Sequence, residues 1–362
     1  MPTEETIYQW RRNHLREIVD SGVILLYRGD ETFNESLYYL TGLDTYHTTV
    51  IISLDNDFEA IFIWSPDYEQ AIKAGLDKVY AVPEPLGEKV LQCLTKLKPR
   101  RVYTDYGVNA KTPLPGEFCN TLQHQLPQAK ITDLPEQLIK MRLIKDEKEI
   151  RCLREVARIA NKAMKHAEDI IAPGLSEMDV AAEIVYTLFK EGAHGIREPI
   201  LASGPNTTIL HHTPSQRIIQ ENEPVLVDIY GAHVGHYVCD HTHTFCSSGE
   251  FTGRNKEILE VVNEAYQAVL QEIRKGQTLN GLTEVASNIF MKLGLERYFF
   301  NRIGHFIGLS DHDPGNFDVT LQEGMVFTIE PHLYLPQERL GVRIEDVVLL
   351  TTGGVEVLGN GA

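Results

Sequence analysis

The stretch from Val225 to Cys246 constrains the fold more than any other part of the chain, because it combines strand-forming residues with two aspartates. Residues 225–227 and 237–245 have the β-branched and aromatic content of strands, and the glycines between them favour a turn, so the stretch predicts a β-hairpin. Asp228 directly follows the first of these segments and Asp240 lies inside the second, although aspartate is disfavoured in strands. Two isolated aspartates would more often be exposed or hydrogen-bonded, so their meaning depends on the rest of the C-terminal third.

The composition is that of a globular protein of more than one domain. The chain has 362 residues, 43% hydrophobic and 23% charged, with a net charge of −17. This charge argues against nucleic acid or an anionic membrane as a partner, since either would require clustered Lys and Arg. No apolar run is long enough to span a membrane, the N-terminus lacks the pattern of a signal peptide, and the five cysteines form no CxxC spacing. We therefore expect a cytoplasmic protein with reduced thiols.

The first 140 residues predict an α/β domain. Strand and helix patterns alternate there: strands over 23–27, 49–53, 59–64 and 101–104, with helices over 7–19 and 86–97. The segment 113–135 contains four prolines and predicts a stretch that leads out of this domain. The expected domains are therefore 1–140 and 141–362.

The second part predicts an α+β domain, in which a sheet is covered by helices. Asp146 and Glu149 form a capping-box pattern at the start of a helix, and Ser176 is the predicted cap of a second helix that ends at Gly192. Two further helices are expected over 255–274 and 282–293, after the hairpin.

Three later segments carry ionisable groups in apolar or glycine-rich surroundings. His305 follows a glycine, Glu330 ends the apolar strand 325–329, and Arg343 and Glu345 alternate with apolar residues. Buried charges are costly unless they are paired or bind a metal. Four carboxylates and one histidine suit two divalent ions, Mn²⁺ or Co²⁺ most readily, with Zn²⁺ and Fe²⁺ possible. A two-metal site of this kind indicates hydrolysis.

These residues, in this order, resemble the pita-bread metallopeptidases, which include aminopeptidase P, prolidase and methionine aminopeptidase, with creatinase as a metal-free relative. The strings that carry the resemblance are Ala-Ser-Gly-Pro-Asn at 202–206, Thr-Ile-Glu-Pro at 328–331 and Val-Arg-Ile-Glu-Asp at 342–346. Tyr-Tyr-Leu-Thr-Gly at 38–42 and the linker 141–149 are similar to the smaller creatinase-type N-terminal domain and its junction. The resemblance implies a C-terminal pita-bread domain with a curved antiparallel sheet covered by helices, and a peptidase acting on Xaa-Pro bonds.

The resemblance also implies a role for each site residue. Asp228 would chelate one metal, Asp240 and Glu345 would bridge both, and His305 and Glu330 would complete the other. A hydroxide bridging the metals would be the nucleophile, and Glu330 would relay its proton. His211 and His312 would bind substrate and stabilise the tetrahedral intermediate. Arg343 would support a ligand carboxylate.

Several positions depart from the family pattern. Asp228 and Asp240 are twelve positions apart, one more than is usual, so we expect a β-bulge near Gly235 that restores the side-chain alternation. Asn301, His332 and His243 replace residues that are usual in the family. The loop 313–321 contains no arginine, whereas dipeptidases of the family commonly have one there to hold the substrate carboxylate. This absence favours an aminopeptidase, or an enzyme with a non-standard substrate, over a dipeptidase.

Three functions remain open from the sequence. The first is a two-metal exopeptidase that cleaves between an N-terminal residue and proline, as a homodimer. The second is a hydrolase or lyase of the same fold that acts on a small non-peptide molecule, which the altered positions favour. The third is a metal-free binding module, because fold does not fix function. The remaining histidines of the hairpin region are expected to be loop or strand-face residues: His212, His233, His236, His241 and His243.

Overall fold

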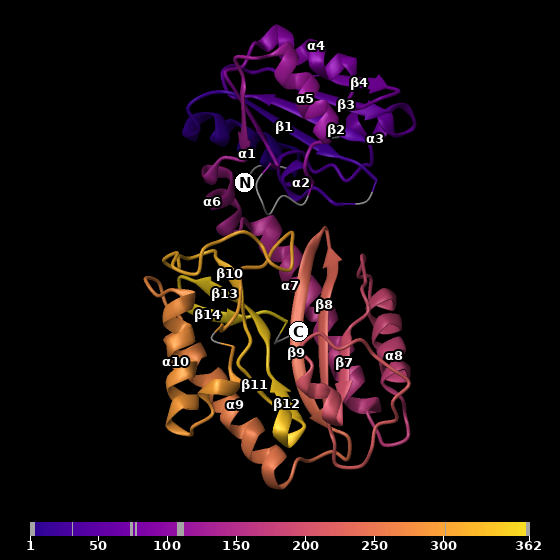
Figure 1. Cartoon of the computed structure of the whole chain (residues 1–362), viewed down its shortest axis with the longest axis vertical. Coiled ribbons are helices and arrows are strands. Elements are labelled where there is room, and N and C mark those ends of the chain that lie inside the picture. Colours follow the sequence, from indigo (N-terminus) through magenta and orange to yellow (C-terminus); the bar gives the residue numbers. More distant parts are fainter. Residues whose placement is uncertain are drawn as a thin grey trace. The chain divides into compact units, whose positions relative to one another are not determined.

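The computed structural model describes residues 4–30, 32–72, 75–76, 78–106, 112–300 and 302–359. The chain divides into two compact units, Met1–Lys140 and Met141–Ala362, each with its own strands and helices (Figure 1). None of the helices in the described ranges is both long and apolar enough to cross a membrane. Asn301 lies outside the described residues.

The first unit is built on a six-stranded sheet in the order β4-β3-β2-β1-β5-β6. The strands are β1 Val23–Arg28, β2 Thr48–Ser53, β3 Glu59–Trp64, β4 Val79–Val82, β5 Arg101–Thr104 and β6 Lys130–Asp133. The helices are α1 Glu4–Ile18, α2 Glu35–Thr41, α3 Tyr68–Ile72, α4 Glu88–Leu97, α5 Gly116–Gln125 and, at the junction, α6 Glu136–Leu143. The central strands pair antiparallel, and β4, β5 and β6 join in parallel, so the predicted α/β domain is confirmed.

The proline-containing segment 113–135 is part of this unit rather than a way out of it, so that prediction is wrong. It holds α5 and the edge strand β6, which pairs in parallel with β5. Pro115 occupies the cap position before α5, where the absence of an N–H group costs no helical hydrogen bond. Prolines therefore mark the start of an element here and not a linker.

The described part of the second unit contains three antiparallel sheets and four long helices. Its strands are β7 Ile200–Ser203, β8 Pro224–Val234 and β9 Tyr237–Cys246 in one sheet, β10 Val326–Ile329, β13 Asp346–Thr351 and β14 Gly354–Val357 in another, and the pair β11 His332–Leu335 and β12 Leu340–Arg343. Its long helices are α7 Glu147–Ile170, α8 Glu177–Lys190, α9 Gly253–Glu272 and α10 Leu279–Lys292. In Figure 1, α7 and α8 accompany β7 to β9, while α9 and α10 accompany β10 to β14. The predicted antiparallel sheet structure covered by helices is confirmed.

Among the described residues, two large apolar cores hold this unit together. One combines α7 and α8 with β7 to β9, and includes Val156, Ile184 and Val227. The other combines α9 and α10 with the later strands, and includes Phe290 and Phe327. An isolated pairing of Thr242 with Glu345 connects β9 to the segment between β12 and β13, so both halves meet at the predicted site residues.

The two predicted helix caps are present. The Asp146 side chain accepts from the backbone N–H groups of Lys148 and Glu149 at 2.8 and 3.0 Å, and the Glu149 side chain accepts from the Asp146 N–H at 2.9 Å. Ser176 and Asp179 form the same reciprocal arrangement before α8. Each cap stabilises its helix by about 1 kcal/mol and fixes where the helix begins beside the hairpin.

The β8–β9 hairpin turns at Gly235 and His236, both of which have positive φ (54° and 67°). The register then shifts by one residue, because Gly231 and Ala232 together oppose Cys239. The bulge therefore lies at Gly231, not near Gly235 as the sequence suggested. Gly231 has φ of 72°, which L-residues rarely adopt, and this explains why the extra residue is taken up there and not in the turn.

The bulge places both aspartates on one face of the hairpin. Beyond it, Asp240 pairs with Tyr230 and Thr242 pairs with Asp228. Directly paired residues and those two apart along a strand share a face, so all four side chains project to the same side. Without the shift, Asp240 would face away from Asp228.

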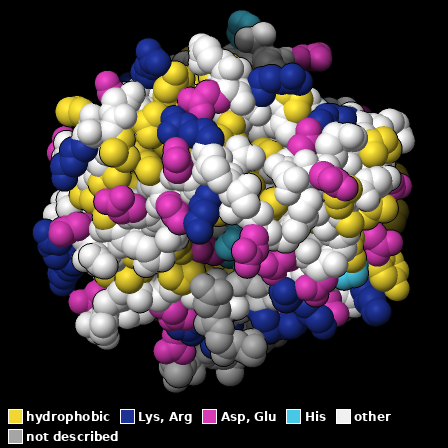
Figure 2. Space-filling model, turned by 90° about the horizontal axis from the view of Figure 1, so that it is seen from below, with side chains coloured by type: hydrophobic (Ala, Val, Ile, Leu, Met, Phe, Trp, Pro, Cys, Tyr) yellow, Lys and Arg dark blue, Asp and Glu magenta, His cyan; other side chains and the backbone are white. Residues whose placement is uncertain are grey.

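The surface carries charges of both signs. Figure 2 shows Lys and Arg side chains interspersed with Asp and Glu and with apolar residues over the visible face of the molecule. The net charge of −17 comes from 51 acidic and 34 basic residues. On this face the acidic excess is thus mixed with basic groups.

Candidate metal centre

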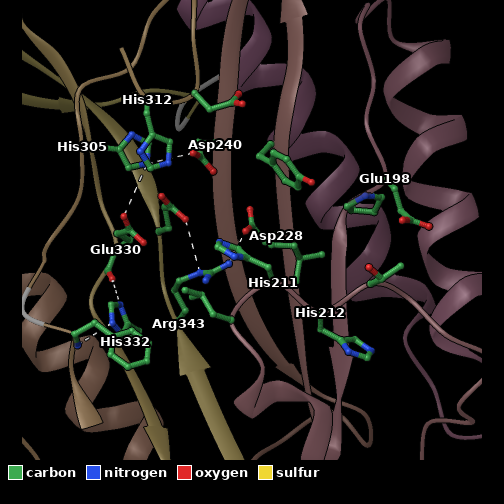
Figure 3. Close-up of a pocket in the computed structure, with 18 of the residues that line it drawn as sticks. Glu198, His211, His212, Asp228, Asp240, His305, His312, Glu330, His332 and Arg343 are labelled. Atoms are coloured by element: carbon green, nitrogen blue, oxygen red, sulfur yellow. Dashed lines mark hydrogen bonds and ion pairs between the residues drawn. The ribbon is translucent and has the colours of Figure 1, made fainter. Parts of the chain in front are cut away.

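One pocket of about 540 Å³ in the second unit brings the predicted site residues together (Figure 3). All eight line it: His211, Asp228, Asp240, His305, His312, Glu330, Arg343 and Glu345. They come from β8, β9, the end of β10, β12 and three loops, which are far apart in the sequence. The pocket is therefore a product of the tertiary fold.

Three of these residues form the densest group of possible metal ligands. Asp240, His305 and Glu345 are all buried, and each offers a ligand atom within 4.8 Å of the others. His305 Nε2 lies 3.4 Å from Asp240 Oδ2 and 3.8 Å from Glu330 Oε1. Carboxylates and an imidazole converge here on one small volume, as divalent first-row ions require.

Arg343 organises the other side of the site. Its guanidinium contacts Asp228 Oδ2, donates to Tyr334 Oη at 2.8 Å and donates to Thr242 Oγ1 at 2.9 Å. Thr242 donates in turn to Glu345 Oε2 at 2.9 Å. One oxygen of each carboxylate is therefore fixed, whereas Asp228 Oδ1 and Glu345 Oε1 are buried without a hydrogen-bond partner among the described residues.

The carboxylates of this cluster carry more negative charge than the neighbouring basic groups neutralise, as the raised pKa values of three of them indicate. Burial raises the pKa of Asp228 to about 7, although Arg343 opposes the shift. Burial, followed by the charges of Glu345 and Asp228, raises the pKa of Asp240 well above its ordinary value. Burial and Glu345 raise the pKa of Glu330 to about 8. A divalent cation would relieve both the repulsion and the two unpartnered oxygens, so these residues fit a metal centre.

Two histidines border the cluster. His312 stacks on the ring of His305, with 3.9 Å between centroids and 10° between planes, and is exposed to the pocket. His211 is also exposed and lies near Asp228 and Arg343 in Figure 3. Exposed imidazoles beside a buried ligand cluster are placed to contact a bound molecule.

His332 is a buried part of the same wall. Its Nδ1 lies 2.9 Å from the carbonyl oxygen of Glu330, and its Nε2 accepts from the backbone N–H of Phe300 at 3.3 Å. Burial lowers its pKa to about 4, so the ring is neutral. Its ring also contacts those of Phe300 and Tyr334, with centroids 5.4 and 5.2 Å away. A histidine at this position thus ties the loop before His305 to the end of β10.

Sequence reasoning missed a buried carboxylate that supports the loop carrying His211. Glu177, the first residue of α8, is fully buried and accepts at Oε1 from Ser203 and Asn206 and at Oε2 from Ser215. His212 Nε2 lies 2.9 Å from Glu177 Oε2, and His212 also lines the pocket, although the sequence predicted no role for it. A glutamate directly after a helix cap was the one available signal, and it is more often a surface residue.

The other histidines of the hairpin region do not line this pocket in the described structure. His233 and His236 stack on each other near the turn, with centroids 4.7 Å apart. His241 is buried with Nδ1 3.4 Å from Asp346 Oδ1, and His243 stacks on Phe245. They occupy strand-face and turn positions, as predicted.

Comparison with known proteins agrees with this arrangement. Residues 151–352 match the family model of metallopeptidase family M24, and residues 12–144 match that of the creatinase/prolidase N-terminal domain. A Xaa-Pro dipeptidase of Pyrococcus horikoshii is 34% identical over 249 residues, which cover 67% of this chain and 70% of that protein.

Solved structures are similar over nearly the whole chain. A Xaa-Pro dipeptidase from Bacillus anthracis has a TM-score of 0.85 and 26% identity, covering 99% of this chain and 98% of that one. An X-Pro aminopeptidase from Thermotoga maritima has a TM-score of 0.85 and 25% identity, covering 97% and 98%. With a family match over more than half of its length, and the metal-binding residue types gathered in one pocket, the chain belongs to metallopeptidase family M24 and is a peptidase of the two-domain creatinase/prolidase type.

Proposed function

We propose that this protein is a Xaa-Pro exopeptidase, which hydrolyses the bond between an N-terminal residue and a following proline with the help of two divalent metal ions. The observation that carries the proposal is the buried convergence of Asp240, His305 and Glu345 on one ligand-sized volume. Membership in a metallopeptidase family implies divalent metal ions. The names of similar proteins, Xaa-Pro dipeptidase and X-Pro aminopeptidase, supply the substrate class.

The five proposed metal-binding residues are Asp228, Asp240, His305, Glu330 and Glu345. Mn²⁺ suits this ligand set best, and Co²⁺, Zn²⁺ and Fe²⁺ are also compatible with it. Two bound ions would supply an activated water as nucleophile and polarise the scissile carbonyl group. Asp240 and Glu345 would bridge the two ions, as the family resemblance implies, and both belong to the group whose ligand atoms lie within 4.8 Å of one another.

The chain's own residues would position and stabilise the reacting groups. Glu330 stands at the end of β10 with an oxygen facing His305, where it takes up a proton from the attacking water. His211 and His312 are exposed to the pocket and donate hydrogen bonds to substrate oxygens as charge develops on them. Arg343 holds Asp228 in place through its bond to Oδ2.

We also propose a domain arrangement and an oligomeric state, which the family resemblance implies, and a cellular location. Residues 1–140 would be the creatinase-type N-terminal domain and residues 141–362 the catalytic domain, in a homodimer located in the cytoplasm. The division of the chain after Lys140 and the two family matches support the domain assignment.

The test is hydrolysis of Gly-Pro, Ala-Pro and a longer Xaa-Pro-Yaa peptide by metal-stripped protein, with and without added Mn²⁺. Asp240→Ala removes a central ligand and should abolish both tight metal binding and cleavage. Asp169→Ala is the matched control, since Asp169 is an exposed residue that pairs with Lys165 and does not line the pocket. It should leave both properties unchanged.

The outcomes separate the three candidate functions. Manganese-dependent cleavage that is lost in Asp240→Ala supports the proposal. Two bound metals without cleavage of any of the peptides would point to a non-peptide substrate, which positions such as His332 would then help to select. Absence of metal binding would leave the binding module as the remaining candidate, at odds with the raised pKa values of Asp228 and Glu330.

A further inference from the structure

The pocket is lined by more carboxylates than arginines. Six carboxylates and two arginines line it: Glu198, Asp228, Asp240, Asp311, Glu330 and Glu345, with Arg302 and Arg343. Metal ions held at the cluster compensate the carboxylates that bind them. A free carboxylate on a substrate would still be repelled by the remaining acids, unless it meets one of the arginines.

Arg343 is not available for this purpose. It is buried, and each of its three guanidinium nitrogens is engaged, by Thr242, Tyr334 and Asp228. Asp311 is likewise paired, through Oδ2, with Arg197 at 2.5 Å. Of the two arginines in the described lining, Arg302 is therefore the one that remains available.

Arg302 is exposed, and its guanidinium lies over the ring of Phe317 at 4.7 Å from the centroid. Stacking orients a guanidinium plane and leaves its N–H edge available. Among the described residues, Arg302 has no ion pair and no side-chain hydrogen bond. Its N–H edge is therefore free for an anion.

The backbone fixes Arg302 beside the reacting groups. The next residue, Ile303, accepts a hydrogen bond from the backbone N–H of Glu330 at 2.6 Å, and its own N–H donates to Thr283 Oγ1 at 3.2 Å. Arg302 also precedes His305 by only three residues. The free guanidinium thus stands on the wall that carries two of the proposed metal ligands.

We propose that Arg302 binds the free carboxylate of the substrate's C-terminal residue, so that Xaa-Pro dipeptides are preferred to longer peptides. This inference rests on the proposed Xaa-Pro activity and names its substrate length. It also revises the preference for an aminopeptidase that the sequence suggested. The loop 313–321 lacks an arginine of its own, but it contributes Phe317, the stacking partner of Arg302.

The test compares three substrates that differ at the carboxylate: Ala-Pro, Ala-Pro amide and Ala-Pro-Ala. The wild-type protein with Mn²⁺ should cleave Ala-Pro with a kcat/KM about 10-fold or more above that for the amide, as expected for a charge-assisted hydrogen bond. Arg302→Gln should remove most of this ratio by raising KM for Ala-Pro alone. Arg302→Lys should keep part of it, because the charge remains.

Arg297→Gln is the matched control. Arg297 is also exposed and also lies 4.7 Å from an aromatic centroid, that of Tyr298, but it does not line the pocket. It should leave all three kcat/KM values unchanged. A structural role of Arg302 would lower cleavage of Ala-Pro and of the amide by the same factor.

Equal losses on both substrates, or a wild-type protein without preference for the free carboxylate, would overturn the role of Arg302 while the Xaa-Pro activity stands. Cleavage of none of the three substrates by metal-loaded protein would instead refute the proposed activity, and the role of Arg302 with it.

Discussion

Replacing Glu177 by Gln should destabilise the second unit and disturb the loop that carries His211. Each carboxylate oxygen of Glu177 faces one backbone N–H group, that of Ser203 at 2.8 Å or that of Ser215 at 3.1 Å. Hydroxyl groups and the His212 ring can reorient, but backbone N–H groups cannot. A glutamine amide, in either orientation, would therefore point its NH₂ group at one of these two donors.

The magnitude follows from the proton affinity of Glu177. Burial alone would raise its pKa, but hydrogen bonds from Ser215, His212, Asn206 and Ser203 outweigh burial and lower the pKa from 4.5 to about 2. At about 1.4 kcal/mol for each tenfold change in proton affinity, this lowering corresponds to about 3 kcal/mol of folding stability. Because the pKa is lowered by folding, this contribution is complete above pH 4.5 and is lost as the pH falls towards 2.

Urea unfolding at pH 7, pH 4 and pH 3 tests this reasoning. Circular dichroism follows the whole chain, while Trp10 and Trp64, the two tryptophans of the sequence, both lie in the first unit and provide an internal reference. Glu177→Gln should lower the free energy of unfolding of the second unit by about 3 kcal/mol at pH 7. The difference from wild type should shrink as the pH falls below 4.5.

Glu183→Gln, an exposed change on the same helix, is the control and should have little effect at any pH. A Glu177→Gln variant as stable as wild type at pH 7, or a difference that does not change between pH 7 and pH 3, would refute the argument.

Three further outcomes are expected. Arg343→Lys keeps the charge but cannot reach all three partners, so Mn²⁺ affinity measured by calorimetry should fall about 10- to 100-fold, and unchanged affinity would contradict its supporting role. Tyr266→Phe removes the hydroxyl that donates to buried Asp346 Oδ2 at 2.5 Å, and should lower the free energy of unfolding in urea by about 1 to 3 kcal/mol. An unchanged free energy of unfolding would mean that another group already satisfies this oxygen. Removal of metal by chelation should lower the unfolding temperature of the second unit. The metal-free Asp240→Asn variant should unfold at a higher temperature than the metal-free wild type, because the substitution removes a repelling charge. A lower unfolding temperature of the variant would argue against repulsion.

Local signals in the sequence predicted much of this fold. The caps at Asp146 and Ser176 mark where two helices begin, because a cap involves neighbours three residues apart. The hairpin was predictable for the same reason, since its strands are joined by a short turn. The candidate site was predictable as a set, because ligand types recur in a fixed order with recognisable flanking residues, and all of them line one pocket.

Features that depend on distant partners were not predictable. Glu177 meets residues 26 to 38 positions away, and no periodicity connects them. Arg302 becomes informative only when Phe317 and the pocket wall are seen together. The position of the bulge was missed because Gly231 and Gly235 are equally suited to positive φ, and only the pairing partners distinguish them.

The bulge at Gly231 also determines which hairpin lengths keep both aspartates on one face. The two aspartates share a face only because the odd residue is absorbed between them. Deletion of Ala232 would take the bulge away with it and leave a regular ladder with both aspartates still on one face, whereas one further inserted residue that no bulge absorbed would turn Asp240 to the other face. Side chains alternate between the two faces of a strand. An insertion or deletion in the hairpin therefore keeps both aspartates in the candidate metal centre only if it involves two residues, or if a bulge is gained or lost with it. Relatives with one residue fewer between these aspartates should have a regular ladder at this point, and a chimaera that exchanges the hairpin tip must exchange the bulge with it.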